Sequence, residues 1–282
     1  MMAILLGIIV GLALGLTGGG GSILAVPLLI YGLDVAPKSA ITLSLAVVAL
    51  TALFGALMAW RHRLLELRAA MIFSAAGIVA APAGILLGDQ VSDRWLLIGF
   101  AVLMMIVALR MLANALRHPE QASVVRADFE HVGLNDTGTV CHYSHDGRLR
   151  LTAPCGLVLA LMGVLAGLLS GLFGVGGGFV IVPALMLVTE MSIHRAVATS
   201  LLVITLVGLS GTASALAGDR PLDWFVGGLF LIGGLIGMGL GRAVAHRLAG
   251  PRLQQLFALV MIAVATYLLM QQWAVMPTGV MT

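Results

Sequence analysis

Two glycine-rich breaks interrupt long apolar stretches of the chain. The first reads Gly15-Leu-Thr-Gly-Gly-Gly-Gly-Ser22 and precedes Pro27, and the second reads Gly171-Leu-Phe-Gly-Val-Gly-Gly-Gly178 and precedes Pro183. Apolar segments broken by glycine at corresponding positions of two halves are typical of the site-forming elements of secondary transporters. The breaks therefore predict one structural element that is built twice within a membrane protein.

One numerical offset relates the two halves. Adding 156 to a residue number converts Gly18 into Gly174 and Ser44 into Ser200, and the register continues without a gap from residue 7 to residue 55. Chance does not produce such a register, so the chain contains an internal duplication. Residues at equivalent places in the two halves are expected to have equivalent surroundings.

The composition places the chain in a membrane. It is 60% hydrophobic and 10% charged, with a mean hydropathy of +1.10, whereas about a quarter of the residues of a soluble domain are charged. Uncharged runs such as 39–60, 69–88 and 196–217 approach the roughly 20 residues that a spanning helix needs. We expect a multi-pass protein of a bacterial-type inner (plasma) membrane, with lipid as a partner. The net charge of +3 belongs to loops and helix ends, so no nucleic-acid partner is predicted.

Five apolar segments are expected in each half. The second segment of each half is too short to span a bilayer upright, so it is a half-helix, a re-entrant arm or a strongly tilted, broken span. The predicted fold is all-α, with two repeats that each combine a glycine-broken hairpin or re-entrant pair with three transmembrane helices. The repeats cover residues 1–116 and 151–282, and a polar connector covers 117–150. The expected segments are 3–16, 22–33, 39–60, 67–88, 95–116, 155–172, 178–189, 195–217, 222–243 and 253–273.

Arginine counts in equivalent loops predict inverted topology. Loop 61–68 has three arginines and its counterpart 217–224 has one, whereas loop 88–94 has one and its counterpart 242–252 has three. Because arginine-rich loops remain cytoplasmic, equivalent loops are expected on opposite sides of the membrane. The same rule places the connector in the cytoplasm.

The breaks are the predicted binding site. Lipid cannot satisfy the backbone groups that a break exposes, so these groups must face a protein cavity or a ligand. The half-helices that follow would present free N–H groups and positive dipole ends, and two such ends together complement a small monoanion. The candidate residues are Thr17, Gly18, Gly20, Gly21 and Ser22 in the first break and Phe173, Gly174, Gly176, Gly177 and Gly178 in the second.

Polar side chains after the breaks supply further candidates. The hydroxyls of Thr42, Ser44, Thr199 and Ser200 could donate to an anion, or could bond to carbonyls of their own helices. The cations Lys38, His194 and Arg195 either attract anions at a vestibule or extend to the membrane interface. The equivalent acids Asp34 and Glu190 either carry a coupled proton or are solvated turn residues.

Other chemistries find little support. Gly174-x-Gly176-x-Gly178 follows a long apolar segment and lacks the acid of a dinucleotide site, and no phosphate-binding loop is present. We therefore expect no enzyme and no cofactor. Cys141-His142-x-x-His145 in the connector could bind a transition metal, but its irregular spacing fits a solvated loop equally well. No metal ligand is assigned.

The motifs resemble the TauE/SafE family of sulfite and organosulfonate exporters across nearly the whole chain except the connector. The second half is most similar, through Gly171-Leu-Phe-Gly-Val-Gly-Gly-Gly-Phe-Val-Ile-Val-Pro183 and Ala196-Val-Ala-Thr-Ser-Leu201. The first half departs from the pattern at Ser22 and at Leu43, which stands where the equivalent of Thr199 would be. The resemblance implies an inner-membrane permease whose small anionic substrate is sulfite, a sulfonate or a similar anion.

Three functions stay open at this point. The leading one is a secondary transporter that exports small sulfur-containing anions. The alternatives are an anion channel or scaffold without a transport cycle, and a metal-ion transporter that uses the histidine-rich connector. The apolar segments contain no central Asp or Glu, which favours efflux driven by the membrane potential alone. The residues do not specify an oligomeric state.

Overall fold

The computed structural model describes residues 1–62, 64–117, 153–189, 191, 193–218, 223–248 and 251–274. Helices account for almost all of these residues, which confirms the predicted all-α fold. Six of the helices in this part of the chain are long and apolar enough to cross a membrane, namely α3, α4, α5, α7, α9 and α10. The elements are α1 (Met2–Thr17), η1 (Gly20–Leu24), α2 (Ala25–Leu33), α3 (Pro37–Arg61), α4 (Leu67–Gln90), α5 (Asp93–Arg117), α7 (Ala153–Phe173), α8 (Gly178–Val188), α9 (Ile193–Ala217), α10 (Trp224–Leu248) and α11 (Pro251–Ala274).

Local sequence signals explain where several helices begin and end. Pro37 occupies the first turn of α3, where its fixed φ suits a helix and its missing N–H is not needed. The Asp223 carboxylate accepts hydrogen bonds from the N–H groups of Phe225 and Val226 at 3.0 and 3.1 Å and so caps the start of α10. Glycine ends the first helix of each half, because Gly18 and Gly174 have φ values of 69° and 71° that side chains disfavour.

The two halves are intertwined. Helix α1 packs on α10 of the other half, and its equivalent α7 packs on α4. Both pairs approach closely through glycine: a Cβ atom on Gly11 would collide with the Gly234 carbonyl, and one on Gly167 with the Gly77 carbonyl. Small residues allow such close approach of helices in a membrane. Neither half therefore has its own separate helix bundle.

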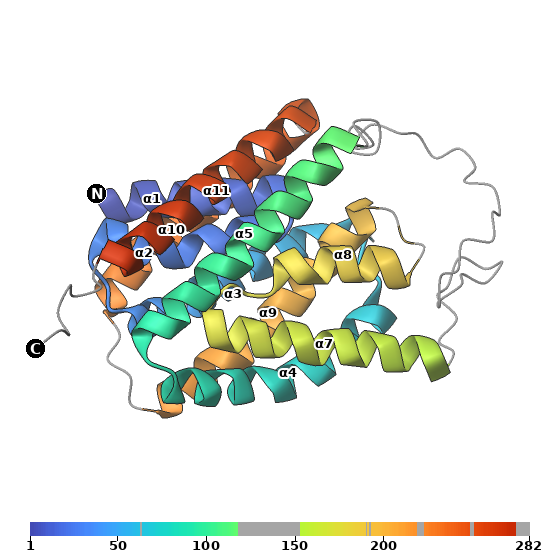
Figure 1. Ribbon diagram of the computed structural model, residues 1–282. Coiled ribbons are helices and arrows are strands. Elements are labelled where there is room, and N and C mark those ends of the chain that lie inside the picture. The colour runs from blue at the N-terminus through green and yellow to red at the C-terminus, as the bar shows by residue number, and fades with distance from the viewer. Residues whose placement is uncertain are drawn as a thin grey trace, which may run out of the picture.

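Two further pairs of equivalent helices pack against each other. Helix α3 crosses its equivalent α9, and α5 lies along its equivalent α11. In Figure 1, α1 begins at the left and α7 begins at the right, so these two equivalent helices start at opposite ends of the molecule. Helices α2 and α8 contain 9 and 11 residues, or about 14 and 17 Å of α-helix, so each is only a half-helix that ends beside the longer ones.

Candidate functional site at the two glycine breaks

The two glycine breaks are in direct contact. A Cβ atom on Gly178 would lie 2.5 Å from the Gly19 Cα atom, and one on Gly19 would lie 2.8 Å from the Gly178 Cα atom. Gly19 directly precedes η1, and Gly178 is the first residue of α8. The N-terminal ends of both short helical elements therefore meet at one point. Their contact closes the space between them.

Positive φ angles explain why glycine is needed here. Gly18, Gly19, Gly174, Gly176 and Gly177 all have φ between 67° and 155°, a region that costs other residues about 1–2 kcal/mol. Gly176 is also confined by packing, because a Cβ atom would lie 2.9 Å from Val48 and 3.2 Å from Ile204.

The other predicted glycines differ in their surroundings. A Cβ atom on Gly20 would meet only the Thr17 side chain, at 3.2 Å, whereas Gly21 packs tightly against the backbone of α1. Gly177 is the N-cap residue of α8 and faces the Ala166 carbonyl. Gly20 is thus the least confined glycine among those predicted to form the site.

Two buried serines connect each break to the opposite half. The Ser200 hydroxyl in α9 donates to the Gly18 carbonyl at 2.8 Å, and the equivalent Ser44 hydroxyl in α3 donates to the Gly174 carbonyl. Ser200 Oγ also lies 2.8 Å from the Val197 carbonyl of its own helix, and its single proton is shared between the two acceptors. Of the predicted hydroxyls, these two make contacts with the breaks from other helices.

Two further hydroxyls hold the first break in shape. Thr17 Oγ1 donates to the Ala13 carbonyl at 2.7 Å and accepts from the Gly21 N–H at 3.0 Å. The Ser22 hydroxyl donates to the Gly19 carbonyl at 2.7 Å. These bonds satisfy backbone groups that the break would otherwise leave without partners.

The remaining predicted residues near the breaks have contacts elsewhere. The Thr42 hydroxyl donates to the Lys38 carbonyl at 3.1 Å, the own-helix bond that the sequence left open as an alternative. Thr199 Oγ1 accepts from the Glu66 N–H at 3.1 Å, at the start of α4. The Phe173 ring packs against Phe100 of α5, with 6.0 Å between the ring centroids.

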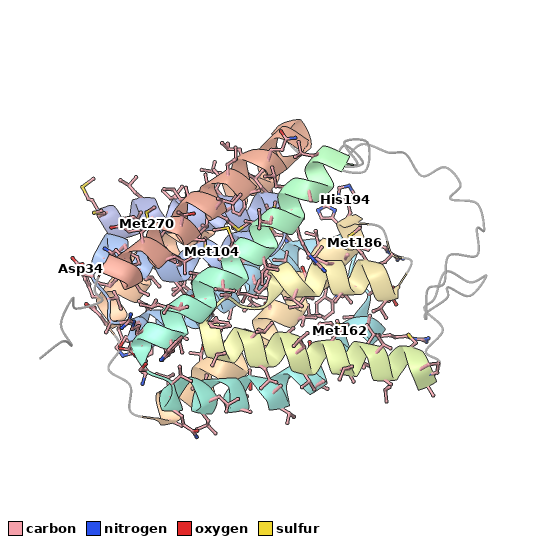
Figure 2. All side chains as sticks on the ribbon, viewed as in Figure 1. Asp34, Met104, Met162, Met186, His194 and Met270 are labelled. Atoms are coloured by element: carbon pink, nitrogen blue, oxygen red, sulfur yellow. The ribbon has the colours of Figure 1, made fainter. Side chains whose placement is uncertain are left out.

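The predicted vestibule residues lie at both ends of the molecule. Figure 2 shows Asp34 at the left end and His194 at the upper right, and both side chains are exposed. Asp34 ends α2 with a φ of 52°, and Arg195 is partly exposed. Glu190 lies outside the described residues.

Lys38 lies where α3 meets the ends of α4 and α5. Its ammonium group donates to the Asp89 carbonyl at 3.2 Å and lies 3.9 Å from the Asp93 carboxylate. It therefore connects the start of α3 to the turn between α4 and α5. Together with Ile41, Ile85, Gly88, Leu96, Gly171 and Leu172, Lys38 surrounds a hollow too small for a water molecule. Lys38 therefore lies near the end of α7, just before the second break.

The sequence analysis missed the position of Arg242, which it counted among loop arginines. This residue lies in α10, is partly buried, and donates from Nη1 to the Gly55 carbonyl of α3 at 2.9 Å. The signal that could have identified it is its place inside the apolar span Trp224–Ala243.

The predicted metal motif cannot be placed, since Cys141, His142 and His145 lie outside the described residues. Within the described part of the chain, no group of three or more His, Cys, Asp or Glu side chains could hold a metal ion.

Comparisons with known proteins identify similar membrane proteins. The family model described as "Sulfite exporter TauE/SafE" matches residues 3–268. The chain is 37% identical over 270 residues to a "Probable membrane transporter protein" of Xylella fastidiosa strain Temecula1, covering 94% of this chain and 93% of the relative. It is 26% identical over 285 residues to the "Probable membrane transporter protein YunE" of Bacillus subtilis strain 168, covering 95% and 97%. No solved structure matches the chain significantly. The chain belongs to the TauE/SafE family of membrane transporters and is a multi-pass protein of the bacterial plasma membrane.

Proposed function

We propose that the chain is a secondary carrier that exports small sulfur-containing anions such as sulfite or organosulfonates. The observation that carries this proposal is the meeting of Gly19 and Gly178, which brings the starts of η1 and α8 together. The first N–H groups of a helix have no partner within that helix. Separation of the two glycines would expose such groups on both sides of one small space.

The chemistry of this space suits a monoanion with several oxygen atoms. A helix N-terminus is equivalent to roughly half a positive charge, and two of them balance one negative charge. The Ser44 and Ser200 hydroxyls now donate to the carbonyls of the breaks. On opening they would be free to donate to the oxygens of a bound sulfite or sulfonate group. The sulfur chemistry itself comes from the description of the family.

Release to either side of the membrane follows from the arrangement of the repeats. We propose that residues 1–116 and 151–282 form inverted-topology repeats, joined by the cytoplasmic connector 117–150. Support comes from the reversed arginine bias and from the opposite starting ends of α1 and α7 in Figure 1. Rocking of one repeat against the other would then expose the breaks alternately.

Flux measurements with purified protein in proteoliposomes test this function. A panel of sulfite, sulfoacetate, taurine, sulfate and chloride should identify sulfite or a sulfonate as the best substrate. A carrier should also accelerate uptake of labelled substrate when unlabelled substrate is present on the opposite side, because the loaded protein reorients. Flux without this acceleration would indicate a channel, and the absence of flux for every anion would indicate a scaffold.

A further inference from the structure

A partly buried arginine lies between α3 and α10, away from the contact of the two glycine breaks. The Arg242 guanidinium donates to the Gly55 carbonyl at 2.9 Å. Gly55 lies in the interior of α3, which continues to Arg61. A carbonyl inside a helix already accepts a bond from the backbone and needs no side-chain donor. The bond therefore satisfies a donor of the arginine and is not needed by the carbonyl of α3.

Arg242 has capacity for a negatively charged partner. A guanidinium has five N–H donors in a planar fork that matches an oxyanion. Within the described ranges, no carboxylate lies within ion-pair distance of this side chain. Arg242 lies near the end of the apolar span Trp224–Ala243 and is partly buried. Burial of a charge without a counter-ion is costly.

The position of Arg242 connects it to the first break. A Cβ atom on Gly15 would lie 3.2 Å from the Arg242 backbone nitrogen, and Gly15 is in the last turn of α1, just before Gly18. The backbone of Arg242 therefore lies about one helical turn of α1 away from the first break. Its side chain reaches across to α3 at Gly55.

The internal duplication shows what Arg242 replaces. Gly84 packs on the Leu168 carbonyl of α7 in the same way as Gly241 packs on the Leu12 carbonyl of α1. The residues that follow these two glycines are Ile85 and Arg242, so they are equivalent. Ile85 lies beside Lys38 and Gly171, close to the second break. At the opposite end, an arginine takes the place of this apolar side chain.

We propose that Arg242 is an anion-binding residue on the path between the first break and the cytoplasmic end of α10. Its guanidinium exchanges the neutral Gly55 carbonyl for two oxygens of a small sulfur oxyanion as the anion arrives at or leaves the break. This inference rests on the proposed function. It adds a second anion-binding position, at Arg242, to the one at the glycine breaks.

Thermal unfolding of the full-length protein in detergent tests the assignment, with sodium sulfite as the probe at constant ionic strength. Arg242→Gln should raise the sulfite concentration that gives half-maximal stabilisation by at least about tenfold, since a charge-assisted bidentate contact is lost. Arg242→Lys should raise it less, because lysine keeps the charge but not the fork. Arg61→Gln, which removes an exposed arginine from the nearby end of α3, should match the wild type.

The outcomes separate the two proposals. Equal sulfite dependence in wild type and Arg242→Gln overturns the role of Arg242 and leaves the proposed function standing. No stabilisation of the wild type by any anion of the panel overturns the proposed function together with this inference. Should Arg242→Gln fail to give a monodisperse protein, Arg242→Lys decides: an unchanged half-maximal concentration contradicts bidentate binding.

Discussion

The Ser200 hydroxyl donates a 2.8 Å hydrogen bond to the Gly18 carbonyl, which lies 182 positions earlier in the chain. In the equivalent bond, the Ser44 hydroxyl of the first half donates to the Gly174 carbonyl of the second half. Helices α3 and α9 thus each contact the break of the opposite half. A movement of α9 relative to the first break, or of α3 relative to the second, would change one of these bonds. The two serines therefore connect helix positions to the conformation of the candidate site.

Removal of the Ser200 hydroxyl should both destabilise the protein and slow transport. Ser200→Ala leaves the Gly18 carbonyl without its side-chain donor, and an unsatisfied buried group costs about 1–3 kcal/mol. The matched control is Thr205→Val on the same helix, because the buried Thr205 hydroxyl, among the described residues, bonds to the Leu201 carbonyl of its own helix. Thermal unfolding and sulfite flux in proteoliposomes measure the two effects. Similar losses in both variants would argue against a special role for Ser200.

A side chain at Gly177 should abolish transport. Gly177 has a φ of 69°, and a Cβ atom added there would lie 3.2 Å from the Ala166 carbonyl oxygen. Gly177→Val therefore adds strain and blocks approach of a ligand to the start of α8. Gly20→Val should have a smaller effect, since that position has no positive φ and meets only Thr17.

Gly239→Ala is the control for these substitutions. A Cβ atom there meets no atom within 4 Å, and alanine favours a helix over glycine by roughly 0.5–1 kcal/mol. Its transport should be normal and its thermal stability unchanged or higher. Normal flux in a folded Gly177→Val variant would place the binding site elsewhere.

Single cysteines should report inverted topology. In a cysteine-free background, cysteines at positions 62 and 245 are expected to react with membrane-impermeant reagents from the cytoplasmic side, and those at 90 and 218 from the outside. The reason is the reversed arginine bias of equivalent loops. Labelling of 62 and 218 from the same side would contradict the inverted arrangement.

Export should follow the membrane potential rather than the pH gradient. A negative interior favours exit of a monoanion by about 2.3 kcal/mol per 100 mV, roughly a fifty-fold gradient. Sulfite flux with potential and pH gradient clamped separately measures this directly. Asp34→Asn and Glu190→Gln should leave the flux unchanged, since the exposed Asp34 suits a solvated turn. Flux that tracks the pH gradient and disappears in either variant would establish proton coupling.

Helix positions could be predicted well because their determinants are local. The expected segments 39–60 and 178–189 agree with α3 and α8 to within about two residues at each end. The segment 222–243 was predicted too short, since α10 continues to Leu248. The basic residues after residue 243 resembled a loop, although basic residues are also favoured in the last turns of a helix.

Partners between helices could not be predicted, because they depend on complementary surfaces rather than on periodicity. Nothing near Thr199 in the sequence identifies the Glu66 N–H as its donor. In the same way, a count of loop arginines cannot reveal that Arg242 reaches Gly55. Ser44 and Ser200 were proposed because the duplication gave them equivalent positions. The structure shows each of them bonded to a carbonyl of a break, and their role in anion binding stays a prediction.

The packing of α1 on α10 affects how the chain must be assembled during synthesis. Helix α1 has 16 residues, about 24 Å of helix, and most of its glycine face is covered by α10 of the second half. At about 5–20 residues per second, α10 is made roughly 10–40 s after α1. During this interval α1 lies in the membrane or in the insertion machinery without α10 beside it. Helix α1 is therefore packed long after it is made, and its final packing depends on α10 of the second half.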